Sequence, residues 1–273
     1  MRRFLRWYLP AGVATAVAAL LAAGFAAGIS GRLGVPVSDT VLPSPTPAPP
    51  VPAGTYLIAA LGDSMTRGAG DASGGYPERV ARALRRAGRN AVVENLAVDG
   101  SETRDILRRM SDPGLERSVD GANLILLSAA GNDLTHSLRR ASPGDGEPAA
   151  AMDDARKAAS ANLRSLLAAI RAANVSAPIR IIGLYDPSGD TGAVRRIERE
   201  GLLAWNVALE EACFSVSGCL VVPIADLFEG RPDRLAADRF HPGPAGYDEI
   251  AARVLSTLVT SRAAGRTARE SER

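Results

Sequence analysis

Four short polar segments of the sequence carry residue types that could cleave an acyl bond. In chain order they contain Ser64, Gly100, Asn132 and the pair Asp238 and His241. Serine attack on a carbonyl needs a base, a group that orients the base, and hydrogen-bond donors for the oxyanion. His241 suits the base because the pKa of histidine lies near neutrality, and Asp238, three residues earlier, can hold one ring nitrogen. The first hypothesis is therefore a serine hydrolase.

Each of these residues also has an ordinary structural interpretation. Ser64 and Gly100 could simply belong to turns, and Asn132 with Asp133 could cap a helix. His241 alone could be a surface histidine, and we interpret the only other histidine, His136, as a residue without a catalytic role at the rim of the cleft. The catalytic interpretation is favoured by the conjunction of the segments, which depends on where the predicted strands end.

Five apolar runs predict the strands that position these segments. They cover residues 56–61, 91–96, 124–128, 179–184 and 220–224. Their continuous apolarity favours strands that are covered on both faces, as in a parallel sheet. Pro223 indicates that the last run is an edge strand. The predicted fold class is α/β, with a flavodoxin-like five-stranded parallel sheet.

Helical patterns lie between most of the predicted strands and after the last one. They cover residues 77–88, 155–173, 202–213 and 245–258. In a doubly wound sheet, ligands bind beyond the carboxyl ends of the strands. The segment that holds Ser64 follows the first strand, and the other three follow the second, third and fifth strands. We therefore expect all four segments to meet at one edge of the sheet.

The four segments resemble the four sequence blocks of the SGNH, or GDSL-type, hydrolase family. They read GDSMT, AVDGSE, AGND and DRFH, and the similarity spans residues 56–260. The resemblance implies a three-layer α/β/α fold, with Ser64 as nucleophile, His241 as base and Asp238 as the acid that orients it. It implies an oxyanion hole made by the backbone N–H groups of Ser64 and Gly100 and by the Asn132 side chain. It implies neither a metal nor an organic cofactor.

Four residues beside these positions add detail to the resemblance, two that agree with it and two that depart from it. Asp63 and Asp133 lie inside the matching blocks, and we expect them to support the site. Met65 stands where the family has leucine, a volume-conserving change. Ala130 stands where the family has glycine, so it would strain the backbone or narrow the pocket if that position needs a positive φ.

The N-terminal segment has the pattern of a membrane segment. Three arginines among the first six residues precede a run without charge that extends to Arg32. Such a run can cross a hydrocarbon core of about 30 Å, and it exceeds the roughly 7–15 apolar residues of a secretory signal. We predict a membrane anchor, or alternatively a cleaved signal, and an extracytoplasmic domain in both cases. The predicted organisation is an anchor or signal at 1–31, a Pro-rich linker at 32–54, a hydrolase domain at 55–262 and a polar disordered tail at 263–273.

Two cysteines, Cys213 and Cys219, are the only ones in the chain. Outside the cytoplasm they could form a disulfide, and the alternative is a pair of reduced buried thiols. Their spacing, without a nearby histidine, argues against a zinc site.

Composition and charge limit the partners. The formal net charge is +2 and basic residues are interleaved with acidic ones, which argues against nucleic-acid binding. We expect a monomeric carboxylic ester hydrolase that meets the membrane through its N-terminal segment. Its substrates would be lysophospholipids, short-chain esters or acetylated glycans. The alternative from another class is a non-catalytic module that binds envelope glycan or lipid on the same fold.

Overall fold

A computed structural model describes residues 54–140, 148–187 and 193–271. All of them belong to the second of two compact units, Pro47–Arg273. The predicted anchor at 1–31 and nearly all of the linker at 32–54 lie outside the described residues. Within the described residues, none of the helices is both long and apolar enough to span a bilayer.

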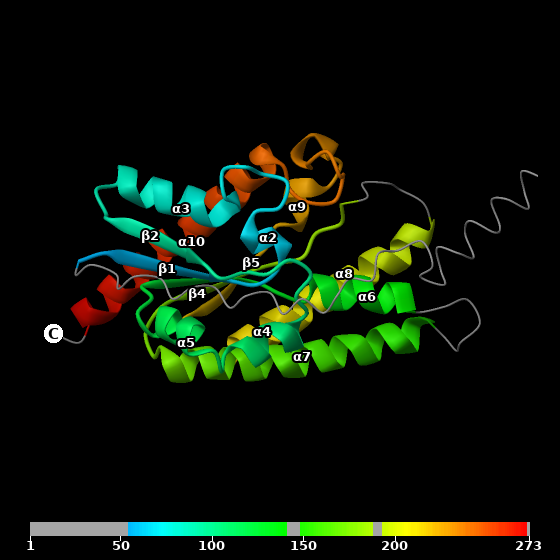
Figure 1. Ribbon diagram of the computed structural model, residues 1–273, viewed down its shortest axis with the longest axis horizontal. Helices are drawn as coiled ribbons and strands as arrows, with labels where there is room; N and C mark the ends of the chain where they lie inside the picture. The colour runs from blue at the N-terminus through cyan, green and yellow to red at the C-terminus, as the bar shows by residue number, and fades with distance from the viewer. Residues whose placement is uncertain (1–53, 141–147, 188–192, 272–273) are drawn as a thin grey trace, which may run out of the picture. The chain divides into compact units, whose positions relative to one another are not determined.

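Five parallel strands form a single sheet in the order β2-β1-β3-β4-β5 (Figure 1). Their bounds are β1 Tyr56–Leu61, β2 Ala91–Asn95, β3 Leu124–Ser128, β4 Ile179–Ile182 and β5 Cys219–Val222. This is the flavodoxin-like order, so the predicted fold class is confirmed for the sheet. β5 is an edge strand, as predicted, but it ends one residue before Pro223, which has no N–H to contribute to a ladder.

Helices cover both faces of the sheet and make three layers (Figure 1). One layer contains α3 Gly75–Arg86, α9 Ala225–Phe228 and α10 Pro244–Ser271. The other contains α4 Thr103–Arg109, α5 Pro113–Asp120, α7 Pro148–Ala173 and α8 Ala193–Phe214. Ile58 and Ala60 of β1 pack in the first core, whereas Ala59 and Leu61 pack in the second. This alternation within an entirely apolar run is what a strand buried on both faces requires.

Several helices differ from the predicted ones. α3 starts two residues before Pro77, because a proline in the first turn lacks only an N–H that has no intrahelical partner. α10 continues to Ser271, so the structure has helix over most of the predicted disordered tail at 263–273. Alanine, arginine and glutamate are common in this stretch and have high helix propensity. The short helices α4, α5 and α9 were not predicted.

A disulfide joins Cys213, near the end of α8, to Cys219, the first residue of β5. Of the two alternatives for these cysteines, the structure therefore has the bonded one. The bond ties the edge strand to a helix at the amino end of the sheet. The candidate site lies at the opposite, carboxyl end.

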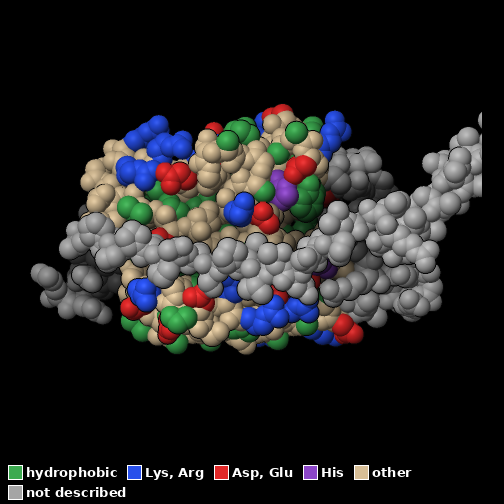
Figure 2. Space-filling view, viewed as in Figure 1, with side chains coloured by type: hydrophobic (Ala, Val, Ile, Leu, Met, Phe, Trp, Pro, Cys, Tyr) green, Lys and Arg blue, Asp and Glu red, His purple; other side chains and the backbone are tan. Residues whose placement is uncertain are grey.

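Charged side chains are mixed over the visible face of the molecule. Figure 2 shows lysine and arginine side chains interspersed with aspartate and glutamate over the described part of that face. The pattern agrees with the interleaving of charges in the sequence and forms no extended basic stripe there.

Candidate active site

Ser64 lies at the sharp turn between β1 and α2 Ser64–Arg67. Gly62 makes this turn possible, because its φ is +131° and a Cβ there would lie only 2.4 Å from the Ser128 carbonyl oxygen. Asp63 caps α2 by accepting a hydrogen bond from the Met65 N–H at 3.0 Å. The turn therefore places the Ser64 hydroxyl at the carboxyl edge of the sheet.

His241 and Asp238 approach Ser64 from the turn that precedes α10. The distance from Nε2 of His241 to Oγ of Ser64 is 2.9 Å, and Nδ1 of His241 lies 2.6 Å from Oδ2 of Asp238. Asp238 Oδ1 accepts the backbone N–H groups of Phe240 and His241, both at 3.0 Å. Burial acts to raise the pKa of Asp238, but these hydrogen bonds outweigh it and hold the pKa below its usual value. The predicted residues thus form a serine–histidine–carboxylate chain.

Tyr185 supports this turn from the loop after β4. Its hydroxyl donates to the Phe240 carbonyl at 2.5 Å, and its ring stacks on Phe228 with centroids 4.1 Å apart. The bond fixes the residue that precedes His241. Sequence reasoning missed Tyr185, because a tyrosine that ends an apolar run has no local mark of this role.

The residues predicted for an oxyanion hole, Ser64, Gly100 and Asn132, come from three segments. Gly100 has a φ of +74°, in the left-handed region that favours glycine. The Asn132 amide nitrogen donates to the Ser101 carbonyl at 3.0 Å, and because an amide nitrogen carries two hydrogens, one donor remains for a ligand. Asn132, Ser64 and His241 line the same pocket.

Ala130 has a positive φ of 74° directly before α6 Gly131–Arg140. Alanine therefore strains the backbone at this position, as the sequence predicted, because an L-residue in the left-handed region costs roughly 1–2 kcal/mol. The Ala130 side chain is buried but is not among the residues that line the pocket. Alanine in place of the family's glycine therefore strains the backbone but does not narrow the pocket.

Asp63 ends a buried chain of hydroxyl groups. Ser128 Oγ donates to Asp63 Oδ1 at 2.6 Å, Thr66 Oγ1 donates to Ser128 Oγ at 2.8 Å, and Tyr76 OH lies 2.6 Å from Thr66 Oγ1. The four residues are each at most 5% exposed. Burial raises the pKa of Asp63, and the bond from Ser128 opposes the rise. The network joins β3 and α3 to the residue next to Ser64.

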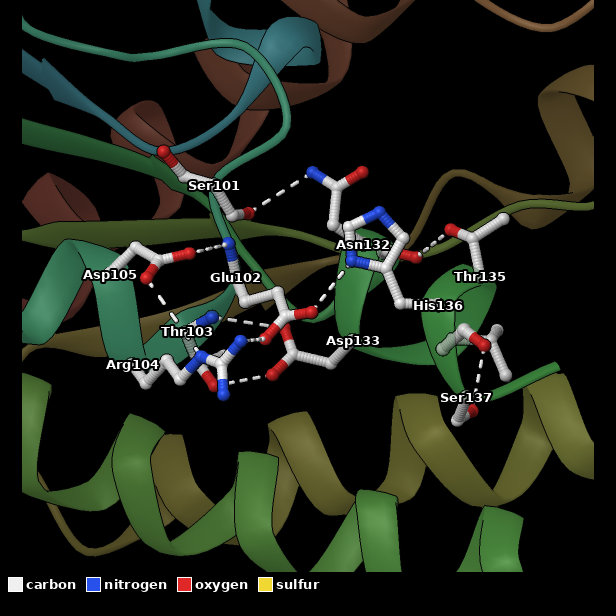
Figure 3. Close-up of polar contacts among 12 residues, drawn as sticks. Ser101, Glu102, Thr103, Arg104, Asp105, Asn132, Asp133, Thr135, His136 and Ser137 are labelled. Carbon is white, nitrogen blue, oxygen red and sulfur yellow. Dashed lines mark hydrogen bonds and ion pairs between the residues drawn. The ribbon is translucent and has the colours of Figure 1, made fainter. Parts of the chain in front are cut away.

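Asp133 holds the segment that follows Gly100. Its two carboxylate oxygens accept the N–H of Thr103 at 2.9 Å and the hydroxyl of Thr103 at 2.7 Å (Figure 3). Burial raises its pKa despite these bonds. Asp133 therefore joins two of the predicted segments, whereas Asp63 joins the turn at Ser64 to the core.

A pocket with a volume of about 290 Å³ opens beside Ser64. Most of its lining is apolar and comes from the nucleophile turn, α6, α7, α8 and the loops after β4 and β5. The apolar lining residues are Met65, Leu134, Met152, Leu184, Pro187, Leu202 and Phe240. Such a pocket can bind the hydrocarbon part of an acyl group next to a nucleophile.

Several known proteins are similar to this chain in sequence or in fold. The model of the GDSL-like lipase/acylhydrolase family matches residues 60–249. The chain is 30% identical over 209 residues to the uncharacterized protein YpmR of Bacillus subtilis, covering 74% of this chain and 81% of that protein. It is 26% identical over 204 residues to the spore germination lipase LipC of Bacillus licheniformis, covering 72% and 93%. The fold resembles the crystal structure of the lipase Lip_vut3 from a goat rumen metagenome, with a TM-score of 0.66, 24% identity, and 74% and 97% of the two chains covered.

Proposed function

This chain belongs to the GDSL-like lipase/acylhydrolase family and is a carboxylic ester hydrolase, and we propose that it acts through Ser64, His241 and Asp238. The observation that supports this proposal is the pair of short contacts on the His241 ring. One ring nitrogen lies 2.9 Å from the serine oxygen and the other lies 2.6 Å from the carboxylate. A nucleophile, a base and an orienting acid need this geometry.

The proposed reaction proceeds through an acyl-enzyme. Nε2 of His241 takes the proton of Ser64 as Oγ attacks the ester carbonyl carbon, and the carbonyl oxygen becomes an oxyanion. The tetrahedral intermediate collapses when the histidine gives its proton to the leaving alkoxide, so an alcohol departs. Water then attacks the acyl-enzyme with the same histidine as base, and the acid and free Ser64 are released. Asp238 stabilises the imidazolium and does not itself become protonated.

The proposed oxyanion donors are the backbone N–H groups of Ser64 and Gly100 and the free amide hydrogen of Asn132. Such donors stabilise charge that develops in the transition state, and loss of one costs about 10²–10³ in rate. Asn132→Ala should therefore lower kcat by that factor while KM changes little.

The shape of the pocket favours a medium-chain acyl group as the substrate's acid portion. The pocket has a volume of about 290 Å³ and a mostly apolar lining, so it has room for the hydrocarbon chain of an acyl group beside Ser64. An acetyl group would fill only a small part of this space, and a polar sugar would match its apolar lining poorly, so acetylated glycans are less favoured. Among the predicted substrates, medium-chain acyl esters, including those of lysophospholipids, fit best.

The proposed location is outside the cytoplasm, with residues 1–31 as an anchor or, alternatively, as a cleaved signal. The support is the sequence pattern of three arginines before a long uncharged run. A reporter phosphatase that folds only outside the cytoplasm, fused after residue 54, should be active. An inactive reporter would contradict the orientation, and release of the reporter into the medium would identify the cleaved signal.

The activity test uses p-nitrophenyl esters from acetyl to palmitoyl and a fluorophosphonate probe on the full chain in detergent. We expect a maximum of kcat/KM near octanoyl or decanoyl and probe labelling that Ser64→Ala abolishes. Labelling that persists in this variant would refute the nucleophile. A folded protein that hydrolyses none of the esters and binds no probe would favour the non-catalytic module.

A further inference from the structure

One face of α6 reaches across to the three residues that follow Gly100 (Figure 3). The reaching side chains lie within little more than one helical turn, and each contacts a different residue of the neighbouring segment. The pairs are Asn132 Nδ2 with the Ser101 carbonyl at 3.0 Å, His136 Nδ1 with Glu102 Oε1 at 2.6 Å, and the Asp133 carboxylate with Thr103 N and Oγ1 at 2.9 and 2.7 Å. The segment is thus attached to α6 at consecutive positions.

The Glu102–His136 pair is the central contact of this attachment. The Glu102 side chain is only 9% exposed, and its second oxygen lies 2.9 Å from Nη2 of Arg104. Its backbone N–H donates to Asp105 Oδ2 at 3.0 Å, which fixes the start of α4. A buried carboxylate is stable only with such partners, so the pair holds the backbone of Glu102 in one place.

This placement matters because both proposed oxyanion donors depend on it. Gly100 lies two residues before Glu102, and Asn132 lies one helical turn before His136. The two donors come from separate segments, and the oxyanion must meet both at about 2.7–3.1 Å. A distant mutation that misplaces a group at the reaction centre by about 1 Å can cost about 10²-fold in rate.

We propose that Glu102 and His136 are positioning residues that set the distance between the two oxyanion donors, the Gly100 N–H and the Asn132 amide. The inference rests on the proposed function. The ring of His136 contacts Glu102, and the base position beside Ser64 is occupied by His241. The effect of His136 on the reaction is therefore through Gly100 and Asn132.

The test compares His136→Ala, His136→Gln and Glu102→Gln with a matched control, Glu78→Gln. Glu78 also pairs with an arginine, Arg85, but both side chains are more than a third exposed on α3. The readouts are kcat, KM, and the rate at which a phosphonate ester forms its tetrahedral adduct with Ser64. The dissociation constant of an unreactive N-alkyl amide with the same acyl chain length measures ground-state binding.

We expect His136→Ala to lower kcat and the rate of phosphonate adduct formation by about the same factor, roughly tenfold, because a displaced donor costs less than a lost one. KM and the affinity for the amide should stay within about twofold of the parent, because the donors contact the oxyanion only in the transition state. His136→Gln should recover most of the loss, since its amide can donate to Glu102. Glu102→Gln should fall between His136→Ala and the parent, because its amide oxygen can still accept from His136 but its amide nitrogen cannot pair with Arg104. Glu78→Gln should resemble the parent.

Two results would overturn the proposal. The first is a His136→Ala variant that melts at the temperature of the parent and keeps the kcat and adduct rate of the parent. The second is a loss of activity that Gln does not restore and that accompanies an equal loss of amide binding, which would indicate a collapsed pocket. Failure of the proposed function is a separate outcome, because it appears as activity that survives Ser64→Ala.

Discussion

Ser128→Ala tests whether the buried hydroxyl chain stabilises Asp63 beside Ser64. The change removes a hydroxyl that donates to Asp63 Oδ1 at 2.6 Å and accepts from Thr66 Oγ1 at 2.8 Å and from the Asp63 N–H at 3.2 Å. A hydrogen bond to a charged group contributes about 1.5–3 kcal/mol, and a buried donor left without an acceptor costs about 1–3 kcal/mol. We expect a total loss of about 3 kcal/mol, because Thr66 retains its contact with Tyr76.

The loss should depend on pH with a definite sign. Burial raises the pKa of Asp63 in the folded state, so the stability linked to this group is fully present below its unfolded pKa and is lost as pH rises through the folded pKa. Ser128 stabilises the ionised form. The cost of Ser128→Ala should therefore be smallest near pH 4, about the unfolded pKa of aspartate, and should grow as pH rises past the folded pKa.

Urea unfolding at several pH values measures this cost. Ser118→Ala is the matched control, because Ser118 is also buried but its hydroxyl donates only to the Gly114 carbonyl at 3.1 Å. That change should cost less than about 1 kcal/mol. In an Asp63→Asn background the cost of Ser128→Ala should fall and lose its pH dependence. A cost equal to that of the control, or one unchanged by Asp63→Asn, would refute the reasoning.

Three other changes test the remaining parts of the structure. Asp238→Asn should lower kcat by about 10⁴, because His241, the proposed base, would lose the hydrogen bond that sets its tautomer, and a loss below tenfold in a steady-state assay would contradict this. Ala129→Gly should lower the free energy of unfolding by about 1–2 kcal/mol, because it removes a buried methyl group. Ala130→Gly should be nearly neutral, because it also relieves the positive φ. Equal costs of the two changes in urea unfolding would show that Ala130 is unstrained. Replacing Cys213 and Cys219 by serine should lower the unfolding free energy by about 2 kcal/mol and leave kcat unchanged, since the disulfide lies at the far end of the sheet, and an altered kcat would contradict that separation.

Much of the fold can be predicted from the sequence, because burial on both faces leaves a mark in single runs of residues. The run LILLS predicts β3 at its observed bounds, and all five residues are buried. Strand ends were less predictable where polar residues or prolines adjoin the run, as at Pro223. The short helices were missed, because one or two helical turns have too few residues to show a period.

The candidate triad can also be predicted from sequence, since Asp238 and His241 are close in the chain and Ser64 directly follows a strand. The possible strain at Ala130 was visible as a departure from a family pattern, but only the structure has its φ of 74°. The supporting contacts were not visible. Ser128 lies 65 residues from Asp63, and His136 lies 34 residues from Glu102.

The sequence by itself therefore determined the strands, the nucleophile turn and the residue types of the site, because these depend on local apolarity and spacing. Only the tertiary structure decided which partner each polar side chain has. His136 forms a hydrogen bond with the buried carboxylate of Glu102, and Tyr185 holds the turn that contains His241. Hydrogen bonds of this kind form between segments that meet only when the sheet is assembled, so no local pattern records them.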